Sequence, residues 1–212
     1  MILQMMSTQN LIEHLLQDRY NQIMKTNEQI IESYQKYIGL VGKYFNEAAA
    51  TELDRALGPR LAVAPRGITA EEGGTVGGLV DYALRVTKKT KHFSELVDHK
   101  SLVRVALVHE LGKLGDDTSD QFLEQDSSWH IEKLGQYYKY NPKCEKMTFV
   151  HRTLYFLTKY GFLMDTNEWI AIITSGGFHL EENRFYARDG HVLSHMLQAC
   201  KCLAEKELKA SA

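Results

Sequence analysis

Residues 102–117 have the sequence LVRVALVHELGKLGDD. Residues 102–108 are apolar on nearly every side, which is typical of a helix that is buried in a protein core. The apolar run ends in a histidine and an acid, His109 and Glu110, and a Leu-Gly-Lys-Leu-Gly stretch follows. Such a pair has two interpretations: it holds a metal ion, or it is the polar end of a buried helix.

The whole chain has the composition of an ordinary globular protein. Its 212 residues suffice for one domain with a full core, and a hydrophobic content of 44% can fill that core. The net charge of −2 argues against a general attraction to nucleic acid or anionic membranes. We expect no signal peptide and no membrane-spanning helix, because neither a basic apolar leader nor a long apolar run is found. The 3 cysteines have no disulfide or metal-site spacing, so we expect a cytoplasmic protein.

Helical periodicity dominates the chain, which contains only 3 prolines. No alternation of strands and helices and no glycine-rich phosphate motif is found, so the pattern predicts an all-α protein. Residues 115–128 are expected to form an acidic loop, and residues 176–191 a second loop. The expected helices cover residues 7–45, 79–91, 94–112, 129–139, 148–161, 166–174 and 191–209.

Two features suggest a division of the chain into three parts. Apolar and aromatic residues recur in steps of four and three between residues 16 and 44, which forms a narrow seam on the first helix. This seam packs on the same domain, or it pairs with a second copy of the chain or with a partner. Six glycines and two prolines in residues 58–78 indicate a loop. We therefore expect an N-terminal helical arm over 1–45, a loop-rich linker over 46–78 and a helical domain over 79–212.

Several segments resemble one known family. VHELGK at 108–113 resembles the HDxGK motif of HD-domain metal-dependent phosphohydrolases, and GGLVDYALRV at 77–86 resembles the helix that precedes this motif. Residues 126–142, 152–162 and 168–186 are similar to segments of small phage-encoded members of the family. The resemblance covers roughly residues 60–205, and it implies an all-α HD-domain bundle with a long N-terminal helix.

The metal-binding positions of the family are mostly changed in this chain. The family typically binds one or two divalent metals through a histidine before the first helix, the His-Asp pair and an aspartate on the last helix. The pair here is His109–Glu110, in which the acid is one methylene longer. The other positions that the resemblance assigns to ligands or their neighbours are occupied by Glu72, Tyr82, Gly176 and Lys201.

Lys201 decides how these changes are interpreted. A lysine has three hydrogen-bond donors and no acceptor, so in the place of a carboxylate it opposes a dication. It can instead pair with Glu110, which would satisfy the polar groups of the pocket without an ion. We therefore expect a pseudo-enzyme with the family's fold, no metal and no cofactor, in which His109 and Glu110 serve packing, hydrogen bonding or a binding pocket.

A small cationic pocket is expected beside the pair. The resemblance places Lys113 near the phosphate and His130 in the substrate pocket, and Lys133 and Lys201 would join them. Such a pocket holds a nucleotide phosphate by charge-assisted hydrogen bonds. Two simpler interpretations stay open: Lys113 is a favourable charge at a helix C-terminus, and His130 is a surface or capping histidine.

These observations lead to three hypotheses about function. The first is a phage protein that acts in the host cytoplasm as an adaptor or inhibitor, by binding a protein partner, with a nucleotide as a further ligand. The second is a metal-dependent phosphohydrolase acting on a nucleotide or phosphomonoester, in which His109 and Glu110 converge with some of Glu72, His130 and His179. The third is an assembly protein that forms homo-oligomers through residues 16–44. If other residues have replaced the family's metal ligands, His151, His191 and His195 are further candidates.

Overall fold

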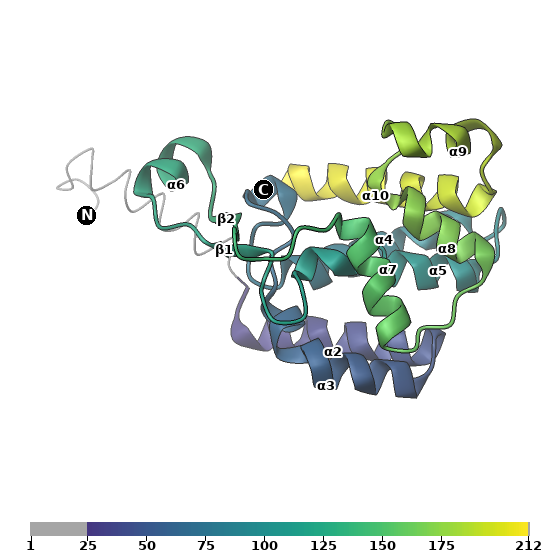
Figure 1. Cartoon of the computed structure of the whole chain (residues 1–212), viewed down its shortest axis with the longest axis horizontal. Helices are drawn as coiled ribbons and strands as arrows, with labels where there is room; N and C mark the ends of the chain where they lie inside the picture. The colour runs from purple at the N-terminus through teal and green to yellow at the C-terminus, as the bar shows by residue number, and fades with distance from the viewer. Residues whose placement is uncertain (1–24, 212) are drawn as a thin grey trace, which may run out of the picture.

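The structure is a computed structural model, and it describes residues 25–211. The regular secondary structure of this part of the chain is helical apart from one ribbon of two short strands, so the all-α prediction is confirmed (Figure 1). The ribbon pairs β1 (Phe122–Glu124) with β2 (Tyr138–Tyr140) in antiparallel orientation. The helices are α2 (Asn27–Tyr44), α3 (Glu47–Val63), α4 (Gly78–Lys89), α5 (His99–Val108), α6 (Ser128–Leu134), α7 (Phe149–Lys159), α8 (Thr166–Ile173), α9 (Arg184–Asp189) and α10 (Val192–Ser211).

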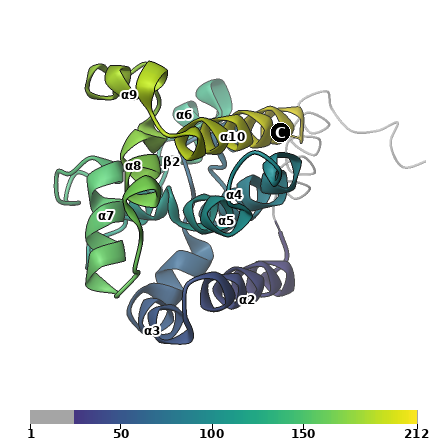
Figure 2. The same ribbon diagram turned by 90° about the vertical axis from the view of Figure 1, so that its right-hand side faces the viewer.

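Helix α5 lies at the centre of the bundle. Figures 1 and 2 show α4 and α5 between the α2–α3 pair on one side and α10 on the other. Helices α7 and α8 cover a further side of this core. Leu102, Val105, Ala106 and Val108 of α5 have no exposed surface. The apolar run at 102–108 is therefore the buried helix that the sequence predicts, and its polar end lies in the middle of the protein.

Helix α2 belongs to the same core. It begins with a capping box, in which Thr26 accepts a hydrogen bond from the Gln29 backbone and the Gln29 side chain accepts one from Thr26. Its apolar face, including Tyr37 and Val41, is buried against α3, α4 and α5. The part of the predicted seam that lies in residues 25–44 therefore packs within the chain and does not form a separate arm. The predicted helix over residues 7–24, and the oligomer seam before residue 25, lie outside the described residues.

The linker prediction for residues 46–78 is wrong over its first half. Asn46 caps helix α3 by accepting from Ala49 N–H at 2.7 Å, and good helix formers follow. Close packing explains the glycine at position 58, because a Cβ there would lie 2.7 Å from the hydroxyl of Tyr34 on α2. Pro59 is inside α3 near its end, where tertiary packing overrides its helix-breaking tendency. Only residues 64–77 form an irregular connection, which includes the 3₁₀ turn η2 (Ala70–Glu72).

The β1–α6–β2 segment also differs from the expectation. The ribbon carries α6 away from the bundle, and no residue of α6 is buried (Figure 1). The predicted helix over 129–139 ends early, because Gly135 adopts a left-handed conformation with φ of 61°. Aromatic residues then favour a strand in place of the helix. The predicted loop at 176–191 contains the short helix α9, and no helix within residues 25–211 is long and apolar enough to cross a membrane.

The 3₁₀ turn η4 (Leu111–Leu114), which follows α5, packs against α7 through Gly112. The Gly112 N–H donates to Thr153 Oγ1 at 2.8 Å, and a Cβ on Gly112 would lie 2.1 Å from the Phe149 carbonyl oxygen. We expect Gly112→Ala to lower the free energy of unfolding by about 1–3 kcal/mol or more, because backbone atoms must move. Gly39→Ala in α2, where a Cβ meets nothing within 4 Å, should raise it by about 0.5–1 kcal/mol. Urea unfolding of both variants measures this, and equal effects would contradict the close contact.

Candidate functional site

The candidate site lies where α5 ends inside the bundle. Asp98 caps the beginning of α5 by accepting from Ser101 N–H at 2.8 Å. The helix then runs through the core and ends with His109 and Glu110 on its inner end, both of which are buried. The turn η4 follows directly and places Lys113 one turn beyond Glu110. The two polar residues of the opening sequence motif are therefore positioned by the burial of the apolar run before them.

Glu110 is the centre of a buried ion-pair cluster. Its side chain is 4% exposed, and Arg66 binds it with two nitrogens. Arg66 Nε donates to Oε2 at 2.6 Å and Nη2 donates to Oε1 at 3.0 Å. Lys113 Nζ lies 3.1 Å from Oε2. Bidentate pairs between arginine and a carboxylate are among the stronger interactions of this kind, so the buried carboxylate is well satisfied.

Lys201 of α10 completes the cluster. Its Nζ lies 3.9 Å from Glu110 Oε1, and it also donates a hydrogen bond to the carbonyl oxygen of Ser175. Ser175 belongs to the 3₁₀ turn η5 (Thr174–Gly176), which also contains the predicted ligand position Gly176. The pair between Lys201 and Glu110 that the family resemblance led us to expect is therefore present in the structure.

Arg66 and Glu205 are the members of the cluster that no sequence pattern indicates. The Arg66 guanidinium lies 3.5 Å from the ring centroid of Tyr82, and its Nη2 donates to Glu205 Oε1 at 3.0 Å. The Tyr82 hydroxyl donates to the same Glu205 oxygen at 3.1 Å. No local pattern marks Arg66, because it stands in an irregular segment and its main partner is 44 residues away in the chain. Tyr82, which the resemblance placed near the metal, supports this arginine.

The cluster shifts the pKa values of its members. Burial alone would raise the pKa of the Glu110 carboxyl, but Lys113, Arg66 and Lys201 hold it well below its usual value. Burial lowers the pKa of Lys113 and of Lys201, and the Glu110 carboxylate opposes this effect in both. The surrounding cations therefore stabilise the carboxylate form of Glu110, whereas burial disfavours the charged form of both lysines.

His109 is neutral and fully buried. Burial lowers its pKa to about 3. Its Nδ1 lies 2.9 Å from the Ala106 carbonyl oxygen, which can only accept, so we assign the proton to Nδ1. Nε2 then carries a lone pair, and this atom has no hydrogen-bond partner among the described residues. His109 therefore has the tautomer of a metal ligand, but within residues 25–211 no further side chains join it to form a metal site.

The residues of the site do not fit the divalent metal that the family resemblance implies. Hard dications need carboxylate oxygens, and both oxygens of Glu110 are already bound by cations. Lys201 places a further positive charge beside them. Within residues 25–211 no three His, Cys, Asp or Glu side chains gather closely enough to hold an ion.

Three predicted site residues lie outside the cluster. His130 is on α6, where its Nδ1 lies 2.8 Å from Ser127 Oγ, and Lys133 is exposed on the same helix. Glu72 lies near Arg66, but its carboxylate accepts hydrogen bonds from the backbone of Ile68 and Thr69. Only its carbonyl oxygen contacts Arg66. The predicted cationic pocket is therefore formed by Arg66 and Lys113, with Lys201 behind them, and without His130 or Lys133.

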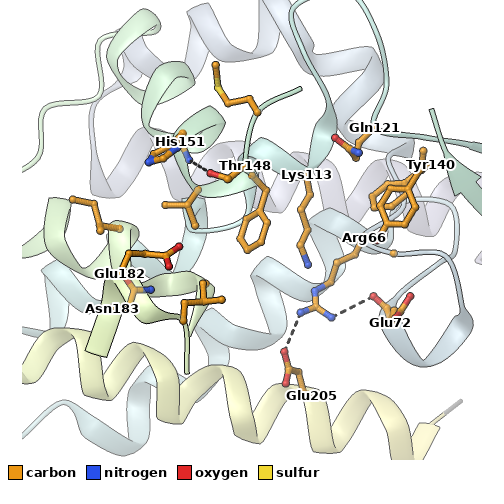
Figure 3. Close-up of a pocket in the computed structure, with 18 of the residues that line it drawn as sticks. Arg66, Glu72, Lys113, Gln121, Tyr140, Thr148, His151, Glu182, Asn183 and Glu205 are labelled. Carbon is orange, nitrogen blue, oxygen red and sulfur yellow. Dashed lines mark hydrogen bonds and ion pairs between the residues drawn. The ribbon is translucent and has the colours of Figure 1, made fainter. Parts of the chain in front are cut away.

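A pocket of about 970 Å³ opens beside the cluster. Figure 3 shows Arg66 and Lys113 in its middle, with His151 and Glu182 on one side and Tyr140 on the other. Tyr140 is contributed by strand β2 and Lys113 by η4, so the ribbon and the end of α5 meet at this pocket. The apolar part of the lining consists of Phe122, Tyr140, Met147, Phe149, Val150, Ile173 and Leu180.

Comparisons of the chain with protein-family models, with curated proteins and with solved structures found no match.

Proposed function

We propose that this chain is an HD-domain-like protein in which metal-dependent hydrolysis has been replaced by binding. The observation that carries the proposal is the saturation of Glu110 by Arg66, Lys113 and Lys201. A hydrolytic site needs an ion that lowers the pKa of a bound water, and the cations occupy the carboxylate that would hold that ion. The resemblance to phage-encoded proteins supports a role in a host cytoplasm.

Exposed apolar side chains support binding to a protein partner. Helix α6 is carried away from the bundle with Trp129 56% exposed, and Leu134 is exposed on the same helix. Phe185 on α9 is also exposed. Aromatic residues such as Trp129 and Phe185 are enriched at surfaces that contact other proteins. An adaptor or inhibitor that uses these elements fits both the site and the surface.

Metal binding tests the loss of hydrolysis. We expect isothermal titration with Mn²⁺ and with Mg²⁺ to give no saturable heat, because the cluster offers no free carboxylate. We also expect no metal-dependent turnover of p-nitrophenyl phosphate. Stoichiometric binding that disappears in His109→Ala, together with turnover that disappears in the same variant, would instead establish the alternative, a phosphohydrolase acting on a nucleotide or phosphomonoester.

A further inference from the structure

The buried cluster carries an excess of positive charge. Its cations are Arg66, Lys113 and Lys201, and its carboxylates are Glu110 and Glu205, so one positive charge has no counterpart within the cluster. Glu205 is also the weaker partner, because its side chain is 44% exposed and solvent screens it. An unbalanced cation in a largely desolvated place attracts an anion more strongly than a cation at the surface does.

The excess charge faces the pocket through Lys113 and Arg66. Both residues line the pocket, and the Lys113 side chain is 19% exposed. Lys201 does not line it, since its amine is turned toward the Ser175 carbonyl and Glu110. In Figure 3 the amine of Lys113 lies next to the Arg66 guanidinium in the middle of the pocket. Arg66 donates four of its five N–H groups to Glu110, Glu205 and the Glu72 carbonyl, so the Lys113 amine is the main donor left for a ligand, with one Arg66 N–H beside it.

The remaining lining restricts the charge and shape of a ligand. Phe122, Tyr140 and Phe149 provide aromatic surface next to the two cations, and Lys113 Nζ lies 5.3 Å from the ring centroid of Phe149. Carboxylates also line the pocket, at Glu71, Glu72 and Glu182, with Lys209 as a cation farther along. These acids disfavour an extended polyanion such as a triphosphate. One anionic head on an aromatic or apolar body fits the lining best.

We propose that the pocket binds, without a metal ion, a ligand that has one singly charged oxyanion on an aromatic or apolar body. The oxyanion accepts hydrogen bonds from Lys113 and Arg66, and the body lies against Phe149, Phe122 and Tyr140. A carboxylate and a phosphodiester share this chemistry. The inference rests on the proposed function only in taking the site to be free of metal, and it is tested with a chelator present.

Binding of small probes to the full chain in EDTA tests the proposal. Calorimetry compares 3-phenylpropionate and methyl phenyl phosphate with the neutral 3-phenylpropanol and with ATP. We expect at least one of the two singly charged probes to bind tenfold or more tightly than the alcohol. The probe that binds more tightly shows whether the pocket prefers a carboxylate or a phosphodiester. No preference over the alcohol, or tighter binding of ATP than of both probes, would overturn the proposal. Metal titration decides the proposed function separately, because it is performed without chelator.

Three variants test the position of the anion. Lys113→Met should weaken binding of the preferred probe at least tenfold, while Lys133→Met, on the exposed face of α6, should leave it unchanged. Glu205→Gln should strengthen binding about threefold or more, because it removes a negative charge and keeps an oxygen for Arg66 and Tyr82. A folding defect cannot produce tighter binding. Unchanged or weaker binding in a Glu205→Gln variant that unfolds at the same urea concentration as the wild type would therefore place the anion away from this cluster.

Discussion

Replacing Arg66 with methionine is expected to lower the free energy of unfolding by about 3–5 kcal/mol, because it leaves the buried Glu110 without its bidentate partner. The remaining cations do not compensate fully. Lys201 lies 3.9 Å from the carboxylate, and Lys113 is a single donor at 3.1 Å. The substitution also removes the guanidinium from the Tyr82 ring and from Glu205. Urea unfolding at neutral pH measures the loss.

Arg55→Met is the matched control for this prediction. Arg55 also pairs with a carboxylate, since its Nη2 lies 2.6 Å from Glu52 Oε2, but both side chains are exposed. We expect a much smaller loss than for Arg66→Met, because exposed pairs contribute little. If Arg66→Met were no more destabilising than Arg55→Met, the buried cluster would not hold the site together in solution.

Stability is expected to fall steeply as the pH decreases from 6.5. Burial lowers the pKa of His109 to about 3, whereas the unfolded chain titrates near the ordinary value of 6.5. Between these two values the unfolded chain binds a proton at His109 that the folded protein excludes. The free energy of unfolding therefore rises with pH by up to about 1.4 kcal/mol per unit in this window, and it levels off above 6.5. Acidification from well above pH 6.5 to pH 4.5 should remove on the order of 2.7 kcal/mol in total.

Below pH 4.5 the free energy of unfolding also depends on Glu110. Its folded-state pKa is held well below the ordinary value of 4.5 by Lys113, Arg66 and Lys201, so its contribution is present above pH 4.5 and is lost as the pH falls further. Measurements between pH 4.5 and 6.5 therefore separate His109 from Glu110.

Urea unfolding at a series of pH values checks this prediction. The wild-type protein should lose stability faster on acidification than His109→Gln, because glutamine does not titrate. His92→Gln, at an exposed position, should keep the wild-type slope. A wild-type slope equal to that of His109→Gln between pH 4.5 and 6.5 would show that His109 is protonated in the folded protein.

Much of the architecture follows from patterns within the sequence. The apolar run before His109 predicts a helix that is buried on nearly all sides, and α5 has this position. Helices α7, α8 and α10 lie close to their predicted ranges, because their apolar residues recur with helical spacing. The pattern fails at α3, where Gly58 and Pro59 indicate a loop. There the glycine allows close packing on Tyr34, and packing outweighs local propensity.

In the candidate site, too, some contacts follow from the sequence and others only from the tertiary structure. The sequence by itself places His109, Glu110 and Lys113 together, because they are neighbours at the end of one buried helix. The pair of Lys201 with Glu110 was anticipated only through the resemblance to HD-domain proteins, which itself stays a prediction. Tertiary structure alone brings Arg66 to Glu110 across 44 residues and keeps His130 and Lys133 away on α6. The physical reason is that periodicity specifies which face of a helix is buried, whereas the partner of a buried charge depends on how distant segments pack together.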